Sequence, residues 1–130
     1  MARIARKGES MRNMSFSMTK RQVRERTKFV TRRLGWENLK PGERVMAIEK
    51  GQGLKKGERV ERLCIIECVG KRRESLNAIT REECALEGFP DMSPDEFVGM
   101  FCKANGCTKK TVVSRIEFRY VDGEAGNVLR

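Results

Sequence analysis

The chain has 130 residues, the usual length of one domain, and carries 28 Lys and Arg side chains against 18 Asp and Glu. It contains no histidine, which excludes Ser-His-Asp and Cys-His catalysis, histidine-ligated metals and a histidine pH switch. The net charge of +10 and the pI near 9.8 favour a polyanionic partner, most simply a nucleic acid or a nucleotide.

The positive charge is concentrated near the N-terminus. Residues 1–33 carry 11 basic and 2 acidic side chains, whereas residues 74–108 carry 2 basic and 7 acidic ones. Charge composition alone supports two interpretations about equally: solvated faces with a basic tail, or a positive surface opposite an acidic helical face.

The sequence predicts one domain over residues 13–121, preceded by a flexible basic arm (1–12) and followed by a polar tail (122–130). No apolar run approaches the roughly 20 residues that a membrane span needs. The basic N-terminus also lacks the apolar core of a secretory signal. We therefore expect a cytoplasmic monomer with no membrane partner.

The first predicted elements alternate between strand and helix. Apolar and polar residues alternate over residues 14–18, which predicts a short strand with one buried face. Thr19 is a good N-cap for a short helix over residues 20–26, which contain no Gly or Pro. Residues 29–33 begin with aromatic and β-branched side chains and are expected to be extended.

Two longer strands are predicted next. A Pro-Gly turn at residues 39–43 precedes a strand over residues 44–49. Seven of the eleven residues 59–69 are apolar or cysteine, which predicts a long central strand. The basic, glycine-rich loop 51–57 lacks the GxxxxGK[ST] pattern, so we interpret it as a hairpin connection and not as a phosphate loop.

Two helices are predicted in the acidic stretch. Thr80 with Glu83 has the spacing of a capping box, and Gly88 is placed to end that helix. Ser93 followed by proline marks a second helix start, and the Asn-Gly pair ending at Gly106 marks its end.

The last predicted element is a closing strand over residues 111–121. Its second half places Ile116 and Phe118 on one side and Arg115 and Glu117 on the other. About five strands and two or three helices predict an α+β fold built on a small, partly closed β-barrel.

The five cysteines predict no metal site and no disulfide framework. Their number is odd, their spacing is not compact, and no CxxC pair exists. We expect reduced thiols that behave as small buried hydrophobes. These are Cys64, Cys68, Cys84, Cys102 and Cys107.

Without histidine, acid–base chemistry falls to Lys, Glu, Asp, Cys or Tyr. Lys28 and Thr31 lie in a basic extended segment, and a bend near Phe29 would bring them to one side. A buried lysine can act as base for a nucleophilic threonine, and Glu87 is a candidate third member. From the residue pattern alone, a solvated strand face is the commoner explanation of such a cluster.

Over residues 15–120 the sequence resembles the ASCH domain, a family of PUA-like β-barrels. The resemblance rests on an ordered series of short motifs. They are a Lys-x-x-Thr-Arg-Arg segment (Lys28, Thr31, Arg32 and Arg33) and residues 39–43, 85–89, 93–97 and 116–118. The resemblance implies a small barrel of five to six strands with helices over its openings and a positively charged cleft for RNA or nucleosides.

Some small bacterial members of this family are amidohydrolases that remove the acetyl group from N4-acetylcytidine. Their catalytic lysine, threonine and glutamate match Lys28, Thr31 and Glu87 of this sequence. The resemblance therefore implies hydrolysis of an N4-acylated cytidine, and we expect no cofactor and no metal.

The competing hypothesis is an RNA-binding module with the same cleft and no chemistry; a protein-interaction domain is a third possibility. Arg33 could stabilise an oxyanion or a phosphate, whereas Arg32 is expected on the opposite, solvated face. Trp36 is either a base-stacking residue or a plug at the barrel end. The full set of predicted contacts to substrate or nucleic acid is Arg26, Arg32, Arg33, Trp36, Lys50, Lys55 and Lys56.

Overall fold

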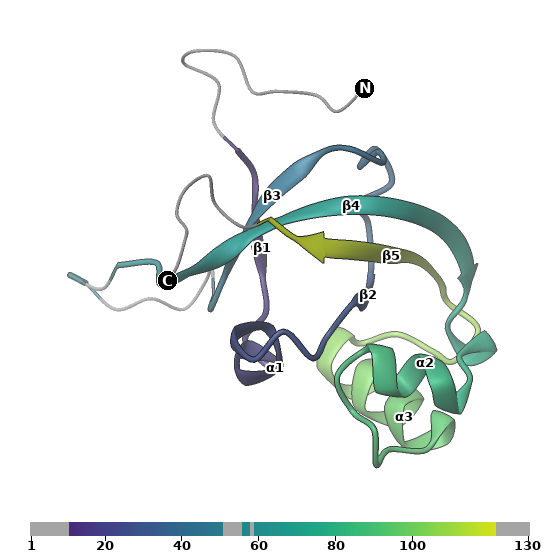
Figure 1. The fold of residues 1–130 in the computed structure, drawn as a ribbon. Coiled ribbons are helices and arrows are strands. Elements are labelled where there is room, and N and C mark those ends of the chain that lie inside the picture. The colour runs from purple at the N-terminus through teal and green to yellow at the C-terminus, as the bar shows by residue number, and fades with distance from the viewer. Residues whose placement is uncertain (1–10, 51–55, 58, 122–130) are drawn as a thin grey trace.

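The computed structural model describes residues 11–50, 56–57 and 59–121. Five strands form one sheet in the order β1-β3-β4-β5-β2, with β1 parallel to β3 and the other pairs antiparallel (Figure 1). The strands are β1 (Asn13–Ser15), β2 (Val30–Arg33), β3 (Arg44–Ile48), β4 (Arg62–Ser75) and β5 (Val112–Tyr120). Together with the helices, this sheet confirms the predicted α+β fold.

Three predicted segments fall partly or wholly outside the described residues. They are the first ten residues of the basic arm, most of the glycine-rich loop, including Lys55, and the polar tail. The predicted hairpin connection at residues 51–57 lies mostly outside the described residues, and β3 and β4 on either side of it are antiparallel neighbours.

The sheet is curved but is not closed into a barrel (Figure 1). β1 and β2 are its two edges, and in the described part of the chain they do not pair with each other. These edge strands have three and four residues, so each offers few hydrogen bonds for closure. β4 continues beyond its predicted end to Ser75, because its polar second half still pairs with β5.

The helical segments are α1 (Lys20–Arg24), a 3₁₀ helix (Leu76–Ala78), α2 (Arg81–Leu86) and α3 (Pro94–Asn105). α2 and α3 lie together at one end of the sheet, and α1 lies apart from them (Figure 1). Within the described residues, no helix is both long and apolar enough to cross a membrane.

The helix ends follow the predicted capping signals with three exceptions. Thr19 occupies the N-cap position of α1, but its side chain makes no capping hydrogen bond. α3 begins with a complete capping box between Ser93 and Glu96 and ends at Gly106, whose φ is +64°. α1 stops before its predicted end, since Arg26 has a left-handed φ of +60° that a helix cannot accommodate. At α2, Thr80 accepts a hydrogen bond from the Glu83 backbone, but the Glu83 side chain does not complete the box, because it pairs with arginines.

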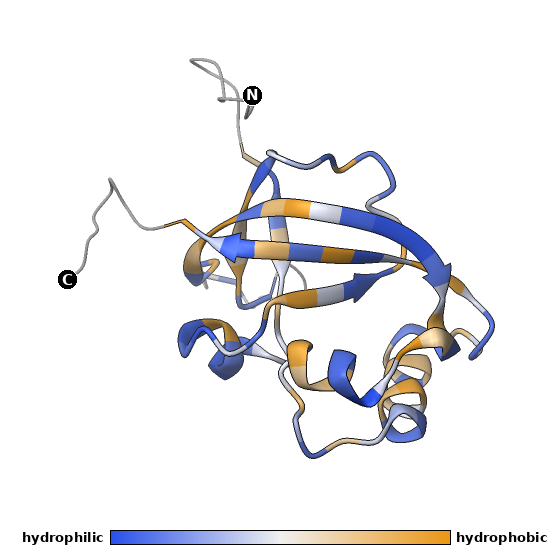
Figure 2. Cartoon of the chain, turned by 45° about the vertical axis from the view of Figure 1, so that its right-hand side comes forward, coloured by the Kyte–Doolittle hydropathy of each residue, from blue (hydrophilic) through white to orange (hydrophobic). Residues whose placement is uncertain are grey.

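Two hydrophobic clusters stabilise the fold. One lies against the sheet and includes Met14, Phe16, Val23 and Phe118. The other joins α2, α3 and the start of β5 and includes Phe97. Figure 2 shows hydrophobic and hydrophilic segments alternating along the strands, as expected for a sheet with one buried face.

The cysteines are free thiols. Cys68 and Cys84 are buried, as predicted, whereas Cys64, Cys102 and Cys107 are only half-buried. The Sγ atoms of Cys102 in α3 and Cys107 just beyond it lie 4.0 Å apart. The described residues contain no group of three or more Cys, Asp or Glu side chains placed to hold a metal ion.

Candidate functional site

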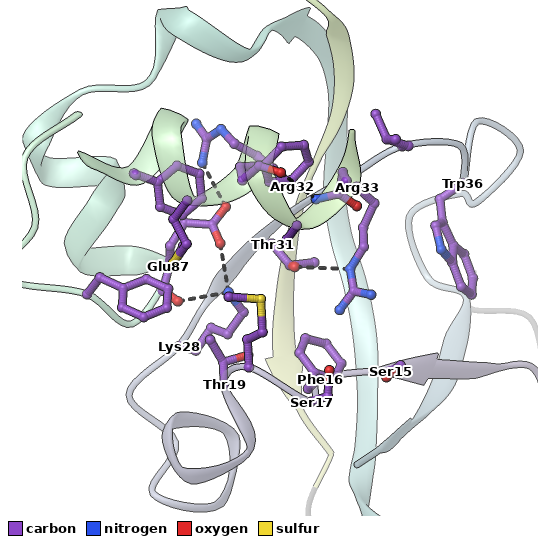
Figure 3. Close-up of a pocket in the computed structure, with 18 residues that line it drawn as sticks. Ser15, Phe16, Ser17, Thr19, Lys28, Thr31, Arg32, Arg33, Trp36 and Glu87 are labelled. Carbon is purple, nitrogen blue, oxygen red and sulfur yellow. Dashed lines mark hydrogen bonds and ion pairs between the residues drawn. The ribbon is translucent and has the colours of Figure 1, made fainter. Parts of the chain in front are cut away.

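A cavity of about 360 Å³ lies between the segment after β1, strand β2, the end of α2 and helix α3 (Figure 3). Lys28, Thr31, Arg33 and Glu87 supply polar groups to its lining. α3 supplies much of the apolar lining through Phe97, Met100, Phe101 and Ala104. The volume is within the range of small-molecule sites, which are mostly apolar with a few convergent polar groups.

Lys28 is 2 % exposed and is held by the end of α2. Its Nζ donates hydrogen bonds to Glu87 Oε1 at 2.7 Å and to the Glu87 backbone carbonyl at 2.8 Å (Figure 3). The backbone around Lys28 is fixed from two sides. The Phe29 amide donates to the Leu86 carbonyl, and the Tyr120 hydroxyl donates to the Lys28 carbonyl.

The pKa of Lys28 is lowered. Burial is the main cause, because it disfavours the charged form. Glu87 opposes this effect by stabilising the ammonium, and the nearby positive charges of Arg33 and Arg32 add to the lowering. Lys28 is therefore neutral in a larger fraction of molecules than a surface lysine at the same pH.

Thr31 and Arg33 lie two residues apart on β2, and both line the cavity. Side chains two apart on a strand share a face, so Arg33 Nε can donate a hydrogen bond to Thr31 Oγ1 at 3.2 Å. The Arg33 guanidinium also lies 4.6 Å from the ring centroid of Phe16. Burial lowers the pKa of Arg33 to about 10, with Glu87 opposing. Arg33 thus places positive charge beside the threonine hydroxyl.

Lys28 and Thr31 reach the same cavity because Lys28 precedes β2, which begins at Val30. The alternation of a regular strand therefore does not govern the direction of the Lys28 side chain. In the described structure Lys28 Nζ bonds to Glu87 and not directly to Thr31. The family resemblance predicted Lys28, Thr31 and Glu87 as one site, and all three line one cavity in the structure.

Arg32 corrects a prediction, because it is buried and not solvated. Its side chain is fully buried, with Nη1 3.0 Å from Glu87 Oε2. Nη2 lies 2.7 Å from Glu83 Oε1 and 2.9 Å from Glu74 Oε2. Burial lowers its pKa, but the three carboxylates outweigh burial and the pKa is raised. The strand pattern could not show that glutamates from α2 and β4 cover this face.

Glu83 connects α2 to two strands of the sheet. It accepts a bidentate pair of hydrogen bonds from Arg115, at 2.8 Å from Nε and 2.7 Å from Nη2, in addition to its bond with Arg32. These bonds, chiefly those from Arg115, lower the pKa of Glu83 to about 2. The acidic stretch predicted from the sequence is therefore in direct contact with basic residues of β2 and β5.

The other predicted site residues divide into two groups. Trp36 lines the cavity with a left-handed φ of +56°, and the Arg12 guanidinium lies 4.7 Å from its ring centroid. Arg26 is exposed, and its guanidinium lies 5.3 Å from the ring centroid of Tyr120. Neither Arg26, the half-buried Lys50 nor the exposed Lys56 is among the residues that line the cavity.

Sequence reasoning missed the apolar contribution of α3 to the site. Phe97, Met100 and Phe101 have the i, i+3, i+4 spacing of an amphipathic helix face, and such a face is usually core. Only the docking of α3 beside β2 shows that the same face also borders a cavity. The role of Arg115 was missed for a similar reason, since its position on β5 indicated an outward-facing side chain.

Gly88 allows the chain to leave α2 beside Lys28. Its φ is +101°, and an added Cβ would lie 2.8 Å from Gln22 Cγ and 3.5 Å from Lys28 Cβ.

We expect Gly88→Ala to reduce the free energy of unfolding by about 1–3 kcal/mol, measured by urea denaturation. Gly99→Ala is the matched control. Gly99 lies within α3 with no neighbouring atom inside 4 Å of the added Cβ, so this change should stabilise the protein by about 0.5–1 kcal/mol. Equal effects of the two substitutions on the free energy of unfolding would contradict the claim that the backbone at Gly88 requires glycine.

No family model and no curated protein matches the chain. Two solved structures share its fold. A DUF984 protein from Enterococcus faecalis V583 has a TM-score of 0.59 at 13% identity, covering 87% of this chain and 77% of its own. An ASCH domain from Lactobacillus crispatus JV V101 has a TM-score of 0.56 at 15% identity, covering 90% of this chain and 86% of its own. The chain therefore has the fold of the ASCH domain, a PUA-like fold.

Proposed function

We propose that this chain, with its ASCH fold, is an amidohydrolase that removes the acyl group from an N4-acylated cytidine. The observation that carries the proposal is the convergence of Lys28, Thr31 and Glu87, all nearly fully buried, on one cavity. Burying an ion pair such as Lys28–Glu87 is costly, and a hydrophobic pair would often be at least as stable. Groups with shifted pKa values in a cavity are candidates for chemistry.

In the first half of the proposed reaction, neutral Lys28 takes the proton of the Thr31 hydroxyl. Thr31 Oγ1 then forms a bond to the acyl carbonyl carbon, whose oxygen becomes negatively charged. Arg33, which already donates to Thr31 Oγ1, supplies positive charge next to this oxyanion. The carbon–N4 bond breaks, and N4 takes the proton from Lys28, so cytidine leaves and an acyl ester remains on Thr31.

In the second half, water attacks the ester carbonyl carbon. Lys28 takes a proton from the water and returns it to Thr31 Oγ1 as the ester bond breaks. The acyl group leaves as a carboxylic acid, which loses its proton to solvent. The sum is one acylated cytidine and one water consumed, with Thr31 and Lys28 restored.

Glu87 orients the lysine in this proposal. Its carboxylate and its backbone carbonyl are both acceptors for Nζ, and two acceptors restrict the ammonium or amine to one position. A fixed donor–acceptor geometry matters because proton transfer requires contact at hydrogen-bond distance.

The test is hydrolysis of N4-acetylcytidine by the purified protein and by Thr31→Val. We expect the unchanged protein to release cytidine and acetate, and Thr31→Val to lose at least about 1,000-fold in kcat/KM. Mass spectrometry after rapid quenching should find an acetyl group on the peptide that contains Thr31. Thr27→Val is the matched control, because Thr27 is exposed and does not line the cavity. Failure of the unchanged protein to hydrolyse any N4-acylated cytosine nucleoside would exclude this function.

The second candidate is RNA binding without chemistry. It is favoured by basic side chains that lie outside the cavity, including Arg26, Lys50 and Lys56, since phosphate contacts need several cations. Salt distinguishes the candidates. Affinity for RNA should fall steeply with salt concentration, whereas affinity for a free nucleoside in the cavity should change little.

A further inference from the structure

The proposed reaction leaves one buried charge near the cavity without a role. Arg32 points from β2 toward α2, its side chain is fully buried, and it contacts Glu74, Glu83 and Glu87. Arg32 is among the residues that line the cavity, as Arg33 is, but its hydrogen-bond connection to the lysine runs through Glu87 (Figure 3).

The two oxygens of the Glu87 carboxylate are divided between two cations. Oε1 accepts from Lys28 Nζ at 2.7 Å, and Oε2 accepts from Arg32 Nη1 at 3.0 Å. A carboxylate held at both oxygens cannot rotate, so the position of Arg32 sets the direction in which Oε1 faces Lys28. A guanidinium suits this task because its donors form a rigid planar fork, which an ammonium lacks.

Arg32 is itself held in place by a second layer of ion pairs. Its Nη2 donates to Glu83 and Glu74, and the bidentate bonds from Arg115 fix Glu83 in turn. Each residue therefore contacts the next in a chain that begins at Arg115 and passes through Glu83, Arg32 and Glu87 to Lys28. The elements β5, α2 and β2 all contribute to it, so the position of the lysine depends on how these elements pack.

Stability alone does not explain this cluster. Arg32 Nε is buried and has no hydrogen-bond partner among the described residues. An incompletely satisfied buried charge costs free energy, and well-packed hydrophobic residues often replace such clusters without loss.

We infer that Arg32 is a positioning residue, which holds Glu87 so that its Oε1 and backbone carbonyl keep Lys28 Nζ in the cavity with Thr31. The inference rests on the proposed function and adds a residue whose guanidinium is bonded to three carboxylates and not to the reacting groups. It predicts that the shape of the Arg32 side chain matters, and not only its charge.

Arg32 also affects the protonation of Lys28. The charged groups that face Lys28 are Glu87 from the end of α2 and Arg32 and Arg33 from β2, and the neutral hydroxyl of Tyr120 on β5 contacts its carbonyl. The cavity lining from the α1 side and from α3 contributes the neutral Thr19 and Asn105. Because the charge of Arg32 lowers the pKa of Lys28, its removal should raise that pKa.

The experiment compares Arg32→Lys and Arg32→Met with Arg115→Lys and Arg115→Met, measuring kcat/KM for N4-acetylcytidine against pH. Arg115 belongs to the same ion-pair chain but does not contact Glu87, so its variants control for general loss of stability. Arg32→Lys should lose about 100-fold in kcat/KM without a shift of the pH profile. Arg32→Met should lose at least as much kcat/KM. The pH at which its kcat/KM rises should also be higher than in the unchanged protein. The Arg115 variants act on Glu87 only through Glu83 and Arg32, so they should lose less kcat/KM than the Arg32 variants and should leave the pH profile at the same pH.

A second measurement does not depend on activity. The Lys28 side-chain signal is followed against pH by NMR of the lysine-labelled protein and is assigned by its absence in Lys28→Met. In Arg32→Met the midpoint should lie at higher pH than in the unchanged protein and in Arg115→Met. If the unchanged protein does not hydrolyse N4-acetylcytidine, the proposed function fails, and this shift alone decides whether Arg32 controls Lys28.

Two results would overturn the inference. One is an Arg32→Lys variant with the kcat/KM of the unchanged protein, which would show that the planar guanidinium is not needed to hold Glu87. The other is an unshifted Lys28 signal in Arg32→Met. If Arg32→Met does not fold, Arg32→Lys still decides the question through its kcat/KM relative to Arg115→Lys.

Discussion

Replacing Lys28 with methionine should reduce kcat/KM for N4-acetylcytidine by at least about 1,000-fold, because the proposed reaction then has no general base. Lys28 is the lysine with a buried amine in the cavity, and its lowered pKa makes the neutral form accessible. Methionine fills a similar volume without charge, so the fold should persist. Circular dichroism and thermal unfolding check that the variant is folded before its activity is compared.

Lys28→Arg separates the role of the base from the role of its charge. An arginine keeps a positive charge next to Glu87, but it does not give up its proton in proteins. We expect this variant to be as inactive as Lys28→Met. Lys40→Met is the control for loss of a lysine, since Lys40 is exposed in a turn and does not line the cavity. Activity in Lys28→Arg would assign Lys28 an electrostatic role, and activity in Lys28→Met would remove it from the mechanism.

Glu83→Ala should lower the free energy of unfolding by about 3 kcal/mol, because it removes the carboxylate that two buried arginines share. Arg115 loses both of its bonds to Glu83, and Arg32 loses one of its three carboxylates. Glu82→Ala is the matched control. Glu82 lies beside Glu83 in α2 but is exposed, so its loss should change stability by less than about 0.5 kcal/mol. Urea denaturation at neutral pH measures both, and similar effects would contradict the structure.

The Glu83 ion pairs also predict how stability depends on pH. The folded pKa of Glu83 is about 2, below its ordinary value of 4.5, so the unfolded chain binds the proton more readily. Its contribution is fully present above pH 4.5 and is lost as the pH falls toward 2. Stability of the unchanged protein should therefore decline through this window, and Glu83→Ala should decline less. Parallel curves for the two proteins would show that Glu83 is not the group responsible.

The architecture was largely predictable because its signals are local. Alternating residues identified the strands, and the Ser93 capping signal identified α3. The long central strand was also predicted, although its end was not, because the polar residues after Gly70 pair with β5 through backbone groups. Closure of a barrel could not be judged from such signals, since it depends on contacts between the first strands and β2.

The candidate site was predictable in part. The motif resemblance selected Lys28, Thr31 and Glu87, and all three line the cavity. The environment of Arg32 was predicted wrongly, because strand alternation says which face a side chain occupies but not what covers that face. The predicted binding residues Arg26, Lys50 and Lys56 do not line the cavity, since a positive charge in the sequence carries no information about its distance from a pocket.

By itself the sequence determined the element types, the charge asymmetry and the fact that any acid–base chemistry must use Lys, Glu, Asp, Cys or Tyr in place of histidine. These properties follow from composition and from patterns within a few residues. Only the tertiary structure decided that α2 packs against β2 and β5, so that Glu87 and Glu83 meet Lys28, Arg32 and Arg115. The reason is physical. Burial and ion pairing depend on the surroundings of a group in space, and residues 59 apart in the chain, such as Lys28 and Glu87, become neighbours only when the helix docks on the sheet.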